Sequence, residues 1–264
     1  MKLLLLTATL ACFSWATTGL AAEPDAVKKH LLPENPKDSV ITLDFQGGYG
    51  LPRSANTPTM SILADGTVLL PANYAGRKSL EGKLSAAELQ ELIAFIVDEN
   101  QFFAYDETAV EKKLEAGGPR RRIPDRSTTV IMVHVDGQQK TVRRTPVGLG
   151  GGEPIVELQQ FGAIRSRLNQ VRSIVQMGGT DEVEKWVKVA NEQLKQQYPD
   201  VAPLTMYDFR SGSERTPGNY SVSFMRILPA APGVRTNEEV TTVSITTYAN
   251  AAPVVSVAWR SVEK

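Results

Sequence analysis

Two kinds of hydrophobic spacing alternate along the chain and predict most of its elements. Hydrophobic and polar residues alternate over 39–45, and runs rich in β-branched residues lie on either side of Asp65-Gly66 and of Asp136-Gly137. Alternation with a period of two is typical of a strand with one buried face. An Asp-Gly pair between two such runs favours a tight hairpin turn, because that turn needs a left-handed backbone. The sequence therefore predicts an opening strand followed by two β-hairpins.

Hydrophobic residues spaced by three or four positions predict three long helices. The first begins at Ser85, where Glu88 completes a capping-box pattern, and its apolar stripe is expected to lie against the first sheet. That stripe consists of Leu89, Leu92, Ile93, Ile96 and Val97. The second helix covers 154–175, and the third starts with Thr180 as its cap. A shorter helix, ended by glycine, is expected over 106–118.

The last part of the chain is predicted to be one helix followed by a meander of strands. Four β-rich runs follow this helix, at 202–211, 219–228, 239–248 and 253–259. A helix that covers one face of an antiparallel meander is typical of an α+β layer pair. Met177-Gly178-Gly179 interrupts the helical pattern before this part. The sequence thus predicts the α+β class, with antiparallel sheets and helices packed on one face, in two domains at 39–177 and 178–264.

The first 38 residues are expected to lie outside both domains. Residues 1–22 contain a basic residue, an apolar run and small residues at Ala21-Ala22, which is the three-part pattern of a secretory signal peptide. Cleavage there removes Cys12, the only cysteine, so the mature chain has no disulfide and no thiol nucleophile. Residues 23–38 are interpreted as a linker, with His30 in solvent. These features predict an exported, periplasmic or secreted protein without a membrane span once the signal is removed.

Charge and motif content argue against several function classes. The chain has 29 basic and 29 acidic residues, so loss of the signal's one lysine leaves a net charge near zero, whereas nucleic-acid-binding proteins have a basic excess. His30 and His134 are the only histidines, and the sequence has neither a Gly-x-Ser-x-Gly motif nor a His-x-x-x-His pair. GLGGGEP at 148–154 lacks the spacing of a phosphate-binding loop. The sequence therefore predicts no catalytic residue, metal ligand, cofactor or nucleic-acid partner.

One cluster of like charge lies at 117–126, GGPRRRIPDR. It contains Arg120, Arg121, Arg122 and Arg126. Planar guanidinium groups suit bidentate binding of carboxylate or phosphate. The neighbouring prolines, glycines and aspartate indicate a loop, where a run of charge is normally solvated. The sequence favours the solvated loop and leaves open an anion or partner contact at these four arginines.

Three motifs of the first predicted domain occur together in a known family. ADGTV at 64–68, GKLSAAELQELIAFI at 82–96 and VDGQQKTV at 135–142 follow the opening strand. With them, residues 39–175 resemble a secreted bacterial domain of unknown function. The resemblance implies a small α+β domain in an exported protein and implies no activity. Members often carry a Cys-Pro loop between the first two strands, whereas the corresponding loop at 46–59 lacks cysteine.

The second predicted domain is similar to a cystatin-like module in the order of its helix and four strands. It lacks the Gln-x-Val-x-Gly loop that cystatins insert into a protease. Shared element order implies a fold and carries no function.

A binding function is the main hypothesis that the sequence supports. We expect a non-catalytic binding or interaction module of the cell envelope, with an envelope protein or an anionic envelope polymer as its partner. Two alternatives stay open. The protein inhibits an envelope hydrolase by inserting the loop at 47–58, or it is a glycan-acting enzyme with two carboxylates that converge in a cleft.

Overall fold

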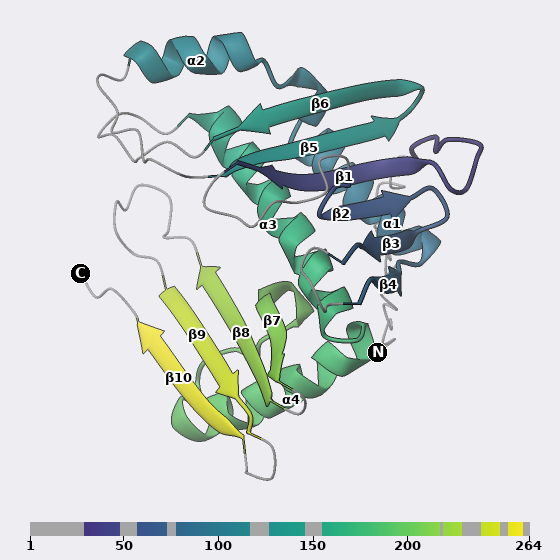
Figure 1. Ribbon diagram of the computed structural model, residues 1–264. Helices are drawn as coiled ribbons and strands as arrows, with labels where there is room; N and C mark the ends of the chain where they lie inside the picture. The colour runs from purple at the N-terminus through teal and green to yellow at the C-terminus, as the bar shows by residue number, and fades with distance from the viewer. Residues whose placement is uncertain are drawn as a thin grey trace, which may run out of the picture.

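Two antiparallel sheets and four α-helices make up the part of the chain that the computed structural model describes (Figure 1). The described residues are 29–47, 57–72, 78–116, 127–145, 155–216, 219–228, 239–248 and 253–260. This architecture confirms the α+β class. Within these ranges no helix is both long enough and apolar enough to cross a bilayer.

The first sheet has six strands in the order β4-β3-β2-β1-β5-β6. They are β1 (Ser39–Gln46), β2 (Met60–Leu63), β3 (Thr67–Leu70), β4 (Leu80–Lys83), β5 (Thr128–Val135) and β6 (Gln138–Arg144). Both predicted hairpins are confirmed, as β2–β3 and β5–β6. In the second hairpin Asp136 and Gly137 have φ of 52° and 69°, which is the left-handed backbone of a two-residue turn. The hydrophobic pattern does not predict β4.

Three helices share one hydrophobic core with this sheet. They are α1 (Ala86–Ala94), α2 (Glu107–Ala116) and α3 (Val156–Gln176). The predicted capping box of α1 is confirmed: the Glu88 N–H donates to Ser85 Oγ (3.2 Å), and the Ser85 N–H donates to Glu88 Oε2 (2.7 Å). After α1 the chain continues through a π-helical turn (Phe95–Glu99) and a 3₁₀ turn (Phe102–Ala104). Leu92 and Ile96 are buried, as expected.

The second sheet is the predicted meander, with strand order β10-β9-β8-β7. Its strands are β7 (Phe209–Thr216), β8 (Asn219–Leu228), β9 (Glu239–Thr246) and β10 (Val254–Arg260). The helix α4 (Thr180–Gln197) packs on one face, where Leu194 shares a core with Phe224 and Val243.

Two local predictions for this part are wrong. The segment 202–211 does not begin as a strand, because Met206–Asp208 forms a 3₁₀ turn and β7 starts only at Phe209. The turn is held by the Asp208 carboxylate, which accepts the Thr205 N–H at 2.7 Å. Thr180 is the first residue of α4 and not its cap, because Gly179, with φ of 109°, occupies the cap position.

The helix α3 runs between the two sheets and contacts both (Figure 1). Its residues Leu168 and Val171 belong to the core of the first sheet, whereas Ile174 packs against the core of the second. The two sheets therefore have separate clusters of buried side chains joined by one helix. A division into two domains near residue 177 stays a prediction.

Candidate functional site

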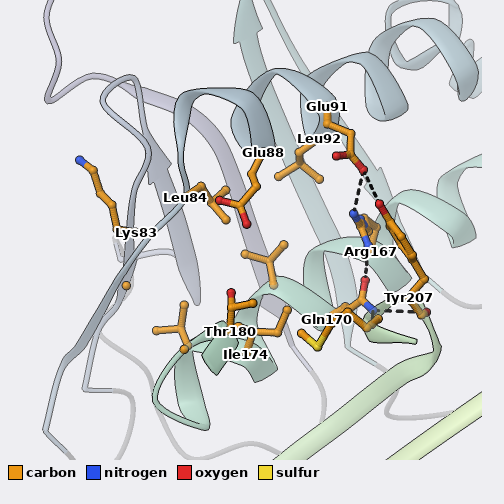
Figure 2. Close-up of a pocket in the computed structure, with 15 residues that line it drawn as sticks. Lys83, Leu84, Glu88, Glu91, Leu92, Arg167, Gln170, Ile174, Thr180 and Tyr207 are labelled. Atoms are coloured by element: carbon orange, nitrogen blue, oxygen red, sulfur yellow. Dashed lines mark hydrogen bonds and ion pairs between the residues drawn. The ribbon is translucent and has the colours of Figure 1, made fainter. Parts of the chain in front are cut away.

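A cleft of about 270 Å³ opens where the first sheet, α3 and the start of the second sheet meet (Figure 2). Five segments line it: the end of β4, α1, α3, the start of α4 and the 3₁₀ turn before β7. These segments are far apart in the sequence, and α3 brings them together because it packs on both sheets. The cleft is thus a product of the way the two sheets are joined.

The floor of the cleft is apolar. It is formed by Leu84, Leu92, Val171, Ile174 and Val175. Leu92 and Val171 also belong to the core of the first sheet, so their positions are fixed by packing. An apolar surface of this kind favours binding of an apolar ligand group, because burying apolar surface contributes about 25 cal/mol of binding free energy per Å².

One end of the floor is closed by an approach of β4 to α3. Gly82 lies so near Val175 that an added Cβ would be 2.5 Å from Val175 Cγ2. A side chain at position 82 would therefore force the strand and the helix apart. Glycine is required there by packing, not by its backbone conformation.

The polar wall of the cleft is a network that joins three of its segments. Glu91 Oε1 on α1 accepts a hydrogen bond from the Tyr207 hydroxyl at 3.2 Å and lies 3.5 Å from Arg167 Nη2 on α3. The Arg167 guanidinium lies over the Tyr207 ring, 5.1 Å from its centre. Figure 2 shows these three side chains meeting at the rim. They are held in place by one another before any ligand binds.

Gln170 extends the network into the second sheet. Its Oε1 accepts from Arg167 Nη1 at 2.6 Å, and its Nε2 donates to the carbonyls of Met206 and Phe209, each at 2.9 Å. Gln170 is buried, so the loss of these bonds would leave polar groups unsatisfied. The side chain therefore fixes the turn that carries Tyr207 against α3.

The two acids that line the cleft already have structural partners. Glu88 accepts the Ser85 N–H in the capping box, and Glu91 accepts from Tyr207 and pairs with Arg167. Among the described residues, no cluster of three or more His, Cys, Asp or Glu side chains could hold a metal ion. The arrangement suits binding of a group with an apolar body and a polar end.

The candidate residues from the sequence are not among the residues that the structure describes. Arg120, Arg121, Arg122 and Arg126 fall within 117–126, outside the described residues. Most of the loop at 47–58 is outside them as well. The cleft was not found from the sequence, because its network joins residues up to 116 positions apart, such as Glu91 and Tyr207. No signal in the sequence marks Gln170, because the apolar positions Leu168 and Val171 on either side of it keep their helical spacing.

The expectation that His30 is solvated is wrong. Its side chain is fully buried, with Nδ1 2.7 Å from Asp136 Oδ2 and Nε2 2.9 Å from Asp98 Oδ2. The backbone of His30 is also held: its backbone N–H donates to Gln90 Oε1 at 2.8 Å, and its backbone carbonyl accepts from Gln90 Nε2 at 3.0 Å. The Leu31 N–H donates to Asp136 Oδ1 at 2.8 Å. This segment is clamped onto the first sheet.

The two aspartates also set the protonation of His30. Burial alone would lower the pKa of the imidazole, but the hydrogen bonds and charges of Asp136 and Asp98 outweigh it and raise the pKa above its ordinary value of 6.5. Both ring nitrogens face a carboxylate oxygen, and only the protonated ring can donate from both. The contacts of His30 with Asp136 and Asp98 are thus strongest when the histidine is charged.

A second hollow, of about 470 Å³, lies beside the segment that contains His30. Its lining includes Leu32 and Ala86, with Lys29, Asp65 and Gln90 as polar members. Asp65 pairs with Lys83, and Gln90 is bonded to the backbone of His30, so both already have partners. Among the described residues, no network of hydrogen bonds like that of Glu91, Arg167 and Tyr207 lines this hollow, and the cleft beside α3 is the stronger candidate.

Comparison of the chain with known protein families, with curated protein sequences and with solved structures finds no match. The resemblances to a secreted bacterial domain and to a cystatin-like module therefore stay predictions.

Proposed function

We propose that the protein is an exported binding protein of the cell envelope, and that its ligand or partner places a compact apolar group in the cleft beside α3. The apolar floor with a preformed polar rim carries this proposal. Such a combination lets apolar contact supply affinity while a few fixed polar groups set orientation. The volume of about 270 Å³ suits one large side chain or ring better than an extended chain.

The positions of the acids support binding over catalysis. A glycosidase needs two carboxylates on opposite sides of the bond that it cleaves. Glu88 and Glu91 are three residues apart on α1 and therefore project from the same side of the cleft. Both also have structural partners that an acid or base would have to give up.

The cellular setting of the proposal rests on the sequence. The signal-like segment at 1–22 supports export, and an envelope protein or an anionic envelope polymer remains the expected partner. The arginines at 120–122 and 126 are a second candidate contact for such a partner. The alternative that the protein inhibits an envelope hydrolase is based on the loop at 47–58. None of these three segments contributes to the argument from the cleft.

A titration with the fluorescent dye anilinonaphthalene sulfonate tests whether the cleft accepts an amphipathic group. Leu84→Trp fills the cleft, whereas Leu80→Trp adds the same bulk to β4 at a residue that does not line it. We expect the dye to bind the wild type and Leu80→Trp alike and to lose most of its binding to Leu84→Trp. Arg167→Gln should weaken binding less, because it removes the positive charge that would meet the sulfonate but leaves the apolar floor open. Equal binding to all four proteins would contradict the proposal.

A further inference from the structure

The two sheets have four edges in the described part of the chain, and three of them carry features that discourage pairing with another strand. Short strands, charged side chains and β-bulges all block edge-to-edge association. The edge strand β4 has only four residues, and β6 carries Lys140, Arg143 and Arg144. The edge strand β7 has two register shifts along its pairing with β8. These three edges are protected.

The fourth edge, β10, lacks these features. It has seven residues, pairs with β9 without a register shift, and reads VVSVAWR, with no proline and its one charge at the end. Figure 1 shows it at the outer margin of the second sheet, and no other described strand pairs with it on that side. Val254 is 59% exposed. A regular, apolar and open edge of this kind is suited to pairing with a further strand.

The hydrogen-bonding pattern shows which backbone groups of β10 point outward. The Thr247 N–H donates to the Tyr220 carbonyl at 3.0 Å, in register with the β8–β9 pairing. Successive residues of an inner antiparallel strand bond alternately to its two neighbours. Thr246 and Ser244 of β9 therefore bond toward β10, where they face Val254 and Ser256. Val255 lies between Val254 and Ser256, and Val257 follows Ser256. Their N–H and carbonyl groups therefore point toward the open edge.

We infer that β10 pairs with β10 of a second copy of this chain, antiparallel and about a twofold axis at Ser256. Val255 of each copy then faces Val257 of the other, and each such pair exchanges two hydrogen bonds. All outward groups of Val255 and Val257 are satisfied in this register. The two four-stranded sheets become one continuous sheet, with the self-complementary interface that a twofold dimer requires.

The side chains of β10 also fit a second copy of the same strand. On the face toward α4, Val255 and Val257 are half-buried, and the pairing adds an apolar neighbour to each. On the opposite face, a row of serines crosses the sheet in register: Ser211, Ser223, Ser244 and Ser256. The twofold axis would continue this row of serines into the sheet of the second copy through a Ser256–Ser256 contact. A partner with bulky or charged residues at these positions would fit less well.

A cysteine at the axis gives a direct test in the full chain with its only cysteine removed by Cys12→Ser. Ser256 forms a non-hydrogen-bonded pair with its counterpart, where Cα atoms are about 4.5 Å apart, within the range of a disulfide. We expect Ser256→Cys to form a covalent dimer under mild oxidation. Ser244→Cys, one strand inward on the same face, is the control. Its counterpart would be three strand spacings away, about 14 Å, so no dimer should form.

A charge exchange at the same position separates specific pairing from random collision. Ser256→Lys and Ser256→Asp each place like charges directly opposite each other, which destabilises a strand pair. We expect each variant to sediment as a monomer, and an equal mixture of the two to recover the dimer. Ser256 is exposed, so neither change should disturb folding. A wild type that sediments as a monomer, or a crosslink that is equally efficient at Ser244→Cys, would overturn the inference. Neither outcome bears on ligand binding in the cleft.

Discussion

Replacement of His30 by Ala should release the segment before β1 from the first sheet and cost stability in a pH-dependent way. The imidazole is fully buried between Asp136 and Asp98, and both of its nitrogens are within 2.9 Å of a carboxylate oxygen. Alanine removes both contacts. The neighbouring backbone bonds of Leu31 to Asp136 depend on the same placement of the segment.

The size of the effect follows from the two contacts. Hydrogen bonds to charged groups contribute about 1.5–3 kcal/mol each. The side chains of Asp98 and Asp136 are 40% and 33% exposed, so the lower end of this range applies. We therefore expect His30→Ala to lower the free energy of unfolding by about 3 kcal/mol at pH 6. As the pH rises through the folded pKa of His30, the ring loses its proton and can donate only one of the two bonds, so the loss in His30→Ala becomes smaller.

The direction of the pH dependence follows from the raised pKa of His30. A group whose pKa is higher in the folded state contributes fully below its unfolded pKa, near 6.5, and loses its contribution as the pH rises through the folded pKa. Urea unfolding at pH 6 and pH 9 of the wild type, His30→Ala and His134→Ala measures this. His134 is the only other histidine, and its replacement should leave the dependence in place. An equal loss at both pH values in His30→Ala would refute the reasoning.

Three further predictions concern packing and the arginine cluster. Leu92→Ala should lower the free energy of unfolding by about 2–5 kcal/mol, whereas Ser85→Ala should lower it by about 0.5–2 kcal/mol. Urea unfolding measures both losses. A larger loss in Ser85→Ala than in Leu92→Ala would mean that the inner face of α1 is wrongly assigned. Gly82→Ala should cost about 1–3 kcal/mol through overpacking, and combining it with Val175→Ala should cost less than the two single losses together, because the clash is removed. Changing the arginines at 120–122 to Gln should leave the melting temperature nearly unchanged, since exposed charges contribute about 0–1 kcal/mol each. Salt-sensitive loss of an anionic ligand in that variant would instead make the cluster a binding site.

Local signals in the sequence predicted the elements whose cause is local. The capping box of Ser85 and Glu88 and the turn at Asp136-Gly137 each depend on residues within four positions, and both are confirmed. The 3₁₀ turn that ends at Asp208 has a similar local cause, a Thr205–Asp208 capping box. It was missed because the alternation of apolar residues around it also resembles a strand.

Elements whose cause is distant could not be predicted in this way. The strand β4 has four residues and no buried side chain, so it exists through its pairing with β3. The burial of His30 depends on aspartates 68 and 106 positions away. The cleft depends on how α3 holds the two sheets, which no pattern along the chain encodes.

Photocrosslinking at the rim of the cleft in living cells tests the proposed binding function most directly. A photoreactive phenylalanine analogue replaces Tyr207, which lines the cleft and is 65% exposed, or Tyr248, which follows β9, is 55% exposed and does not line the cleft. We expect a specific adduct from position 207 that is absent from position 248 and is lost when Leu84→Trp fills the cleft. Adducts that form equally at both positions, or that persist at position 207 in the filled variant, would contradict a ligand-binding cleft beside α3.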